Sequence, residues 1–467
     1  MKPCTLDAVT IAAEVRAGRL RASDAVDSCL ARIAATDDRV NAFTTVLDTR
    51  ARARALMVDS KPDRHTLPLA GVPFAVKNLF DIAGLPTLAG SKIERDAPAA
   101  ARDALLVRRL EAAGAILVGA LNMDEYAYGF TTENSHYGAT CNPHDLARTA
   151  GGSSGGSAAA ISAGQVPLTL GSDTNGSIRV PASLCGCFGL KPTFGRLPRT
   201  GTYPFVASLD HLGPFARSVR DLALCYDLMQ GWCAEDPGCA PRAAEPVSAV
   251  LDDIDLGGLR LATLGGWWRE MADADALAAV SLVREALGVT RDIELPEVAR
   301  ARAAAFLITN AEGANLHLPD LRTRADDFEP LSRDRFLAGA LLPAGWVQQA
   351  QRVRRRFAHE VAQVFDTVDV LLAPATPCVA PLLGTEWLSL GTQRLPARPS
   401  LGLLAQPLSC IGLPVVTVPV WNAQSSAPHL PLGVQVIAAP WREDLALRVA
   451  AALAREPWCR APIAPLA

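Results

Sequence analysis

The sequence predicts an α/β protein built around one large sheet, on three observations. Over residues 5–230, patterns typical of amphipathic helices alternate with short apolar runs typical of buried strands. Strand-like runs return late in the chain, behind a mostly helical block. Of the 467 residues, 49% are hydrophobic, which allows a sizeable core. We therefore expect a single domain over 1–467, with a core at 5–230, a helical insertion at 251–365 and a return to the sheet at 366–455.

The first part of the chain supplies helices and then two strands with a helix between them. Residues 5–36 repeat apolar side chains at helical spacing, so two short helices are expected, with Ser23 as a candidate N-cap of the second. Branched apolar residues interrupted by glycine and proline make 67–80 strand-like. The helical pattern at 101–114 ends at Gly114, and the apolar run AILVGA that follows predicts a buried strand.

Two glycine- and serine-rich loops come next, each joined to regular elements. SAAAISAG (157–164) predicts a short helix, and VPLTLGSD predicts a strand that runs directly into the second loop. The stretch 233–250, rich in proline, alanine and acidic residues, is the best linker candidate, and 270–365 is mostly helical and rich in arginine. Strand patterns then return in VDVLLAPATP (368–377), LPVVTVPVW (413–421) and LPLGVQVIAAP (430–440).

Composition excludes several classes of protein. The chain carries 45 basic and 48 acidic side chains, and this balance is unlike that of a stand-alone protein that binds nucleic acid or anionic membranes. The first residues, MKPCTLDAVTIAAE, lack the apolar core of a signal peptide. No run reaches the ~18 apolar residues that a membrane span needs. We expect a cytoplasmic protein with no membrane contact.

The cysteines indicate reduced thiols. There are 11 of them, an odd number, scattered without the CxxC spacing of a zinc site. Cys185 and Cys187 are separated by one residue, a poor geometry for a disulfide or a chelate. We expect no metal and no organic cofactor.

The residues that carry chemistry are two serines set among glycines and one isolated lysine. Ser153 lies in GGSSGGS and Ser177 in GSDTNGSIRVP, while Lys77, one of only five lysines, lies in the apolar run LPLAGVPFAVKNLF. A serine is a poor nucleophile until a base takes its proton, and a lysine can be that base where desolvation keeps it neutral. No His–Asp pair lies near either serine in the sequence, which therefore indicates acyl chemistry of the Ser–Lys kind.

The first serine loop, 151–157, allows three interpretations. A flexible linker disagrees with the helix and strand patterns that press against both of its ends. A phosphate-binding loop would carry a lysine directly after the glycines, whereas alanines follow Ser157. A catalytic turn, in which glycines permit strained backbone angles and close approach of a substrate, fits this loop best.

The second serine loop has the small residues that an oxyanion hole needs. The successive backbone N–H groups of Thr174, Asn175, Gly176 and Ser177 can point into one cavity. Such donors supply about 3–4 kcal/mol of transition-state stabilisation. We expect these four residues to form the oxyanion hole.

The stretch Gly151–Thr193, with Lys77 upstream, resembles the amidase signature family, whose motif ends in a GLKPT-like segment. The resemblance extends from about residue 5 to about residue 455. It implies an α/β/α sandwich around a large mixed sheet. It also implies that Ser177 is the acylated nucleophile, that Ser153 is a bridging serine on a cis peptide bond, and that Lys77 is the general base.

Other residues of the second loop match family positions. The resemblance implies an ion pair between Asp173 and Arg179 that shapes the loop. Many members carry a Gly–Gly pair before the nucleophile, where this chain has Asn175 and Gly176. Asparagine tolerates left-handed backbone angles better than most residues, so the oxyanion hole is expected to persist. The Asn175 side chain is a further candidate for substrate binding.

Within the family, the chain resembles hydrolases that release ammonia from small carboxylated ureas and biurets. The resemblance rests on 121–138, 171–186, 326–336, 371–377 and 433–441. It implies a substrate such as 1-carboxybiuret, which belongs to the degradation of cyanuric acid. The alternative is the glutaminase chain (the A subunit) of glutamyl- or aspartyl-tRNA amidotransferase, which shares the triad and liberates ammonia from glutamine. A catalytically silent assembly subunit is a third interpretation, against which the intact lysine and serines argue.

An anionic substrate needs a group that binds its carboxylate. Arginine suits this task because its planar fork binds carboxylates bidentately. Arg335 lies near an arginine position of the amidotransferase A subunits and is the candidate, with a structural arginine as the alternative. His317, on an apolar stretch, is expected to be a core histidine. RVRRRF (352–357) has no interleaved aromatic residues and is expected to form a solvated helix face.

The resemblance also implies a partner. Relatives of this kind work with a small helical subunit similar to the amidotransferase C subunit, which wraps the larger chain. We expect such a subunit here, with the two chains forming a heterotetramer.

Overall fold

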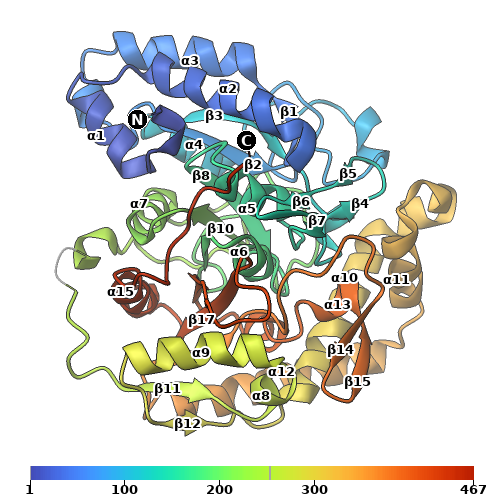
Figure 1. The fold of residues 1–467 in the computed structure, drawn as a ribbon. Helices are drawn as coiled ribbons and strands as arrows, with labels where there is room; N and C mark the ends of the chain where they lie inside the picture. Colours follow the sequence, from blue (N-terminus) through green and yellow to red (C-terminus); the bar gives the residue numbers. More distant parts are fainter. Residues whose placement is uncertain (1, 252–253, 467) are drawn as a thin grey trace.

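The computed structural model of the chain describes residues 2–251 and 254–466. Within them, 11 strands form one mixed sheet in the order β1-β3-β2-β8-β10-β9-β16-β17-β13-β11-β12 (Figure 1). The strands are β1 (Phe43–Val46), β2 (Pro73–Lys77), β3 (Ile116–Leu121), β8 (Leu168–Asp173), β9 (Phe188–Lys191), β10 (His211–Ala216), β11 (Leu261–Leu264), β12 (Asp292–Ile293), β13 (Val370–Pro374), β16 (Val415–Val420) and β17 (Leu432–Ala438).

The sheet is mixed because it contains both parallel and antiparallel pairs of strands. β2 runs parallel to both β3 and β8, and β11 runs parallel to both β12 and β13. The central strands β8, β10, β9, β16, β17 and β13 pair antiparallel. The predicted α/β class with a large mixed sheet is therefore confirmed. Three two-stranded ribbons lie outside the sheet: β4 (Glu133–Asn134) with β5 (Gly138–Ala139), β6 (Cys141–Asn142) with β7 (Asp145–Thr149), and β14 (Trp387–Leu390) with β15 (Gln393–Pro396).

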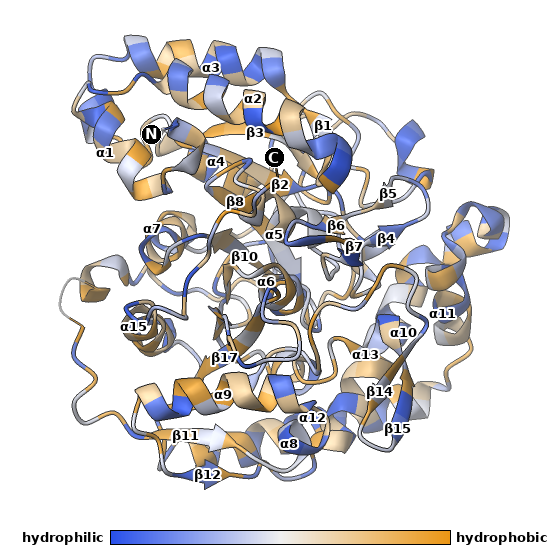
Figure 2. Cartoon of the chain, viewed as in Figure 1, coloured by the Kyte–Doolittle hydropathy of each residue, from blue (hydrophilic) through white to orange (hydrophobic). Residues whose placement is uncertain are grey.

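Helices cover the sheet. Figure 2 shows that its strands are largely apolar, while the outer helices carry polar residues on their solvent sides. α2 and α3 pack on β3, α6 and α15 on β16 and β17, and α9 on β13 and β17. The helices are α1 (Ala8–Arg16), α2 (Ala22–Val40), α3 (Asp48–Ser60), α4 (Leu105–Ala112), α5 (Gly155–Ser162), α6 (Arg179–Cys185), α7 (Val219–Met229), α8 (Trp267–Glu270), α9 (Ala274–Ala286), α10 (Val298–Thr323), α11 (Pro330–Ala340), α12 (Ala344–Val364), α13 (Ala397–Ser400), α14 (Gln406–Cys410) and α15 (Glu443–Leu453).

The capping role predicted for Ser23 is wrong. Helix α2 begins at Ala22, two residues earlier than an N-cap at Ser23 implies, and its N-cap Arg21 makes no side-chain cap. Asp59, at the end of α3, accepts hydrogen bonds from the N–H groups of Ala22 and Ser23 at 2.6 and 3.1 Å, and from the Ser23 hydroxyl at 2.7 Å. A carboxylate from a neighbouring helix thus does the work of the cap, which local sequence cannot reveal.

Residues 254–365 are mostly helical and also contribute to the sheet. β11 and β12 come from this segment and extend the sheet beyond β13. Helices α10, α11 and α12 pack against one another, and α10 also packs on α14. The stretch 233–250 has no helix or strand until a short turn of 3-10 helix at Ser248–Leu251, as expected for a connector.

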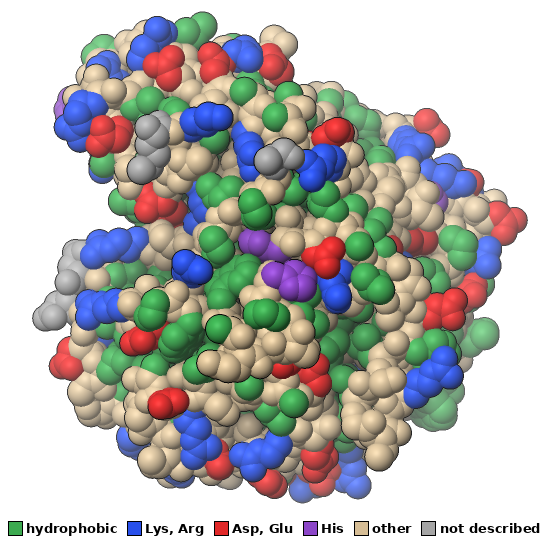
Figure 3. Space-filling model, viewed as in Figure 1, with side chains coloured by type: hydrophobic (Ala, Val, Ile, Leu, Met, Phe, Trp, Pro, Cys, Tyr) green, Lys and Arg blue, Asp and Glu red, His purple; other side chains and the backbone are tan. Residues whose placement is uncertain are grey.

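The surface is electrostatically mixed. On the face drawn in Figure 3, Lys and Arg side chains are interspersed with Asp and Glu side chains over all elements in view. Arg354, within the predicted solvated run 352–357, instead bonds the carbonyls of Cys410 and Ser208 at 2.6 and 2.8 Å. No helix in the described ranges is long and apolar enough to cross a membrane.

Candidate active site

Lys77 ends strand β2 and is completely buried. Its Nζ donates hydrogen bonds to Ser153 Oγ at 2.7 Å and to Ser172 Oγ at 2.8 Å. Strand β2 is flanked by β3 and β8, and all its residues are buried because apolar side chains occupy both faces. The isolated lysine of the apolar run therefore meets the first serine loop, as predicted.

The environment of Lys77 favours its neutral form. Burial lowers the pKa of Lys77 from its ordinary value of 10.5 to about 7, against the opposing attraction of Asp124, Asp210 and Asp173. A neutral amine hydrogen-bonded to a serine hydroxyl can accept a proton from it. A buried amine with such a pKa has the property that a general base needs at neutral pH, and this role of Lys77 stays a prediction.

Ser153 stands at a tightly packed turn before α5. The Gly152–Ser153 peptide bond is cis, as the family resemblance implies. A Cβ on Gly152 would lie 2.1 Å from Asp124 Oδ2, so only glycine fits there. The close approach of Asp124 explains the glycine before the serine.

Ser177 lies in the second loop, after β8 and before α6, and is 2% exposed. Gly176 has a φ of 138°, and its missing side chain leaves room for Ala405, whose Cβ would lie 2.8 Å from an added Cβ. Over the described ranges, Ser153 Oγ bonds Lys77 but makes no hydrogen bond to Ser177. The lysine and the first serine are thus joined, whereas the link from Ser153 to Ser177 stays a prediction.

One member of the predicted oxyanion hole is already engaged. The Gly176 N–H donates to Asp173 Oδ1 at 2.7 Å, so this donor does not face a substrate. The N–H groups of Asn175 and Ser177 have no acceptor among the described residues, and the Thr174 side chain donates to Asp210 at 2.6 Å. The four-donor prediction is corrected at Gly176, because the Asp173 carboxylate lies against the loop and takes this N–H.

Asp173 and Arg179 form the expected ion pair. Arg179 Nε and Nη2 each lie 3.0 Å from a carboxylate oxygen of Asp173, and both side chains are fully buried. Asp173 also accepts from the Ile178 N–H and the Ser409 hydroxyl. Burial would raise the pKa of Asp173, but the Arg179 guanidinium outweighs it and holds this pKa below its ordinary value. The pair fixes the backbone between the end of β8 and the start of α6.

Asn175 points toward helix α10. Its Nδ2 donates to Thr309 Oγ1 at 2.8 Å, and its Oδ1 is buried without a partner in the described chain. An acceptor buried in this way is free for a donor of a bound molecule. The substrate-binding role of Asn175 stays a prediction, and its unpartnered Oδ1 is compatible with it.

Arg335 lies on α11, which packs against α10. Its guanidinium lies 3.6 Å from the centre of the Tyr128 ring and donates to the Tyr128 carbonyl at 3.0 Å. Its Nε is buried and unpartnered within the described ranges. The Tyr128 hydroxyl in turn bonds Asn310, the neighbour of Thr309. Arg335 and Asn175 are thus connected through adjacent residues of one helix.

A buried ionic cluster lies next to the Ser153 turn, where the Asp124 N–H donates to the Ser153 carbonyl. Arg398 bridges Asp124 at 3.1 Å and Glu329 at 2.7 Å. Glu329 immediately precedes α11, Asp124 follows β3, and Arg398 lies in α13. Burial raises the pKa of Glu329 despite the attraction of Arg398. The cluster joins three distant segments beside the lysine.

His317 is a core histidine, as expected. Its ring centre lies 3.9 Å from that of Tyr126 and 4.8 Å from that of Phe336, and burial lowers its pKa to about 4. No group of three or more His, Cys, Asp or Glu side chains in residues 2–251 and 254–466 is arranged to hold a metal ion. All 11 cysteines are free thiols.

Sequence reasoning missed Ser172, Thr309 and Asp210. Ser172 is the second acceptor of Lys77. Its nearness to Lys77 follows from the pairing of β8 with β2, which sets Val76 opposite Leu170 and which the sequence does not reveal. A second buried lysine was also missed. Lys191 ends β9, donates to the Pro192 carbonyl at 3.1 Å, and burial lowers its pKa to about 7. Among the described residues, Lys191 makes no hydrogen bond to a serine.

Comparison with known proteins decides the family. The amidase family model matches residues 24–447, which contain every site residue discussed above. The chain belongs to the amidase family. It is 56% identical to AtzE, the 1-carboxybiuret hydrolase subunit of Pseudomonas sp. (strain ADP), over 94% of this chain and 96% of that protein.

Two further relatives complete the comparison. The chain is 36% identical to the A subunit of glutamyl-tRNA(Gln) amidotransferase from Nitratidesulfovibrio vulgaris (strain DP4), over 97% of this chain and 96% of that protein. A solved structure of a vestigial protein complex, which concerns the origins of an s-triazine catabolic enzyme, matches with a TM-score of 0.95. The two sequences are 55% identical, and the match covers 97% of this chain and 99% of the chain in that structure. This amidase is a hydrolase that acts on amide C–N bonds.

Proposed function

We propose that this amidase releases ammonia from a small carboxylated urea or biuret, with 1-carboxybiuret as substrate, in the degradation of cyanuric acid. The observation that carries the chemistry is the 2.7 Å hydrogen bond between buried Lys77 Nζ and Ser153 Oγ. The substrate is supported by the 56% identity to the 1-carboxybiuret hydrolase chain, against 36–39% to the amidotransferase chains.

The proposed reaction is a two-step acyl transfer. Neutral Lys77 accepts a proton from Ser153 as Ser153 accepts that of Ser177, and Ser177 Oγ bonds to the terminal carbonyl carbon. The N–H groups of Thr174, Asn175 and Ser177 stabilise the oxyanion. The C–N bond then breaks, ammonia leaves with a proton returned along the relay, and water hydrolyses the acyl-enzyme to a dicarboxylated urea.

The substrate groups match the unpartnered polar atoms of the site. Arg335 Nε is a buried donor without an acceptor, as a substrate carboxylate requires, and Asn175 Oδ1 is a buried acceptor, as a urea N–H requires. In our proposal, Arg335 binds the carboxylate and Asn175 the urea nitrogen.

We further propose that the active form contains a small helical subunit similar to the amidotransferase C subunit, in a heterotetramer. The solved relative described as a vestigial protein complex supports an assembly of this kind.

The test is ammonia release by the chain co-expressed with a small helical subunit of the proposed kind. The substrates are 1-carboxybiuret generated in place from cyanuric acid, biuret and glutamine, with Ser177→Ala as the blank. We expect rapid release from 1-carboxybiuret and little from glutamine. Release from glutamine alone would assign the chain to the amidotransferases instead.

A further inference from the structure

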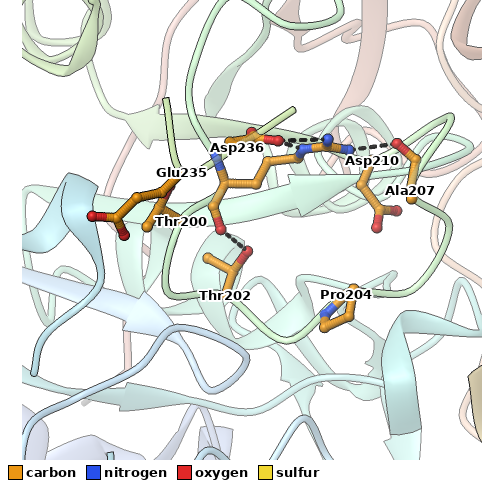
Figure 4. A pocket seen from close by; sticks show the side chains of 8 residues that line it. Thr200, Thr202, Pro204, Ala207, Asp210, Glu235 and Asp236 are labelled. Atoms are coloured by element: carbon orange, nitrogen blue, oxygen red, sulfur yellow. Dashed lines mark hydrogen bonds and ion pairs between the residues drawn. The ribbon is translucent and has the colours of Figure 1, made fainter. Parts of the chain in front are cut away.

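A cavity of about 180 Å³ is lined in part by the Asp210 carboxylate, which is bonded to Thr174 in the loop that carries Ser177. Its lining includes Arg199, Asp210, Glu235 and Asp236 (Figure 4). Asp236 is bound by Arg199 Nε and Nη2 at 3.1 and 2.9 Å, and Glu235 pairs with exposed Arg102. Asp210 differs from both, because its side-chain partner is Thr174 of the nucleophile loop.

Sheet register brings Asp210 to this position. β10 pairs antiparallel with β8, with His211 opposite Asp173. Asp210 directly precedes β10 and Thr174 directly follows β8, so the same register sets the two residues opposite each other. The Thr174 hydroxyl donates to Asp210 Oδ1 at 2.6 Å.

The other oxygen of Asp210 is held by the backbone. Oδ2 accepts from the N–H groups of Phe205 and Val206 at 2.9 and 2.8 Å, and the Asp210 N–H donates to the Val206 carbonyl at 2.9 Å. Burial raises the pKa of Asp210 above its ordinary value, and the three donors that fix the carboxylate oppose this rise because each favours the ionised form. The carboxylate joins the 205–210 turn to the first residue of the nucleophile loop.

Asp210 also acts on the lysine through space. The carboxylates that face Lys77 are Asp124 after β3, Asp173 at the end of β8 and Asp210 before β10. Asp124 is in direct contact with Arg398, which it shares with Glu329, and Asp173 is in direct contact with Arg179. Arg199 faces Asp210 electrostatically, but its ion pair is with Asp236. Asp210 is therefore the carboxylate of the three whose charge is not cancelled by a contacting cation.

We propose that Asp210 is a positioning residue of the Lys77–Ser153–Ser177 site: it anchors Thr174 at the start of the nucleophile loop and supplies a fixed negative charge that faces Lys77. The inference rests on the proposed relay. Because burial lowers the pKa of Lys77 and the Asp210 charge opposes that effect, removal of the charge lowers this pKa further. Loosening of the site would admit water and raise the pKa instead, so the direction of the shift separates the two explanations.

The experiment measures the rate at which a fluorophosphonate labels Ser177, as a function of pH. Labelling forms the Ser177 Oγ–P bond, breaks the P–F bond and releases fluoride, while the serine proton passes to the lysine. The reaction needs the relay and no knowledge of the natural substrate. Ser177→Ala is the blank, and mass spectrometry of the peptide identifies the labelled residue.

Three variants separate the charge of Asp210 from its hydrogen bond. In Asp210→Asn the amide can still accept from the backbone and donate to the Thr174 hydroxyl, so the charge alone is lost. We expect its acid limb to move to lower pH by about half a unit or more. Thr174→Val keeps the charge and loses the hydroxyl, so its limb stays in place while the plateau rate falls about tenfold. Glu235→Gln, on the same cavity but paired with the exposed Arg102, leaves both unchanged.

An acid limb of Asp210→Asn that does not move, or that moves to higher pH, overturns the proposal. If Asp210→Asn does not fold, Asp210→Glu keeps the charge but displaces the carboxylate, and it must reproduce the slow plateau and unmoved limb of Thr174→Val. Failure of wild-type Ser177 to react would overturn the relay itself and this inference with it. If wild-type Ser177 reacts but the acid limb of Asp210→Asn does not move, only the proposed role of Asp210 is overturned.

Discussion

At the scale of single residues, one lysine combines two properties that its sequence context predicts separately. Lys77 is isolated in an apolar run, which predicts burial, and it lies upstream of two serine loops, which suggests a base. Its complete burial and its 2.7 Å contact with Ser153 are both present. The second acceptor, Ser172, comes from an adjacent strand, and strand order is not written in local sequence.

Replacing Lys77 by methionine is expected to abolish activity without loss of stability near neutrality. The base contributes about 10²–10⁴-fold to the rate. Because the folded pKa of about 7 lies below the ordinary 10.5, the buried lysine reduces stability below pH 10.5, and fully so below about pH 7. Urea unfolding at pH 7 checks this. A Lys77→Met protein much less stable than wild type would identify a structural lysine.

The pH dependence of kcat/KM follows from the same group. Lys77 is charged below its pKa of about 7, so the base is lost and kcat/KM is expected to fall about tenfold per pH unit below that value. Steady-state ammonia release between pH 5 and 9 measures the limb. A profile flat down to pH 5 would contradict the assignment of Lys77 as the base.

Arg335→Ala is expected to raise KM for the anionic substrate by about tenfold or more, because a charge-assisted bond to the carboxylate is lost. Uncharged biuret provides the comparison, since its KM should change little. The two KM values are measured with wild type and variant in parallel. If KM for the carboxylated substrate stays within about twofold, Arg335 does not bind the carboxylate.

At the scale of elements, predictions from local pattern were most successful where packing and pattern agree. The runs containing β2, β3, β8, β13, β16 and β17 were identified because buried strands read as continuous apolar segments. The start of α2 was missed, since its capping carboxylate belongs to α3. Gly176 was misassigned for a similar reason, because Asp173 reaches it through a turn that the sequence does not specify.

The ionic cluster that joins α11 and α13 to the end of β3 predicts a large effect on stability. Arg398→Met leaves Asp124 and Glu329 buried without a cation, which costs about 3–5 kcal/mol of unfolding free energy. Arg260→Met breaks a half-exposed pair with Asp369 and is the matched control, with an expected loss of at most about 1 kcal/mol.

The loss in Arg398→Met should depend on pH. Without the cation the pKa of Glu329, which burial already raises, rises further, and its protonation relieves buried charge in acid. Urea unfolding at pH 8 and pH 5.5 tests this, and the loss is expected to be smaller at pH 5.5. Equal losses of unfolding free energy in Arg398→Met and Arg260→Met would show that the buried cluster contributes no more to stability than an exposed ion pair does.

At the scale of the whole molecule, the sheet joins the two ends of the described chain. Strands from the first 50 residues and from residues 432–438 belong to the same sheet, as the late return of strand patterns predicts. The strand order and the placement of β11 and β12 within the largely helical segment were not predictable, because they depend on long-range pairing rather than local periodicity.

The proposed partner subunit predicts a change in the state of the whole molecule. Co-expression with the small helical subunit is expected to yield a heterotetramer with full activity, whereas the large chain alone should aggregate or lose activity. Size-exclusion chromatography with light scattering measures the masses. A chain that is monodisperse and fully active by itself would exclude an obligatory partner.

The parallel pairing of β2 with β8, which sets Val76 opposite Leu170, also has a consequence for how this sequence can change in length. Side chains alternate between the faces of a strand, so inserting or deleting one residue before Lys77 in β2 would turn the amine to the opposite face. The connector at 233–250 imposes no such parity. Gains and losses of single codons should therefore accumulate in the connector and be purged from these two strands.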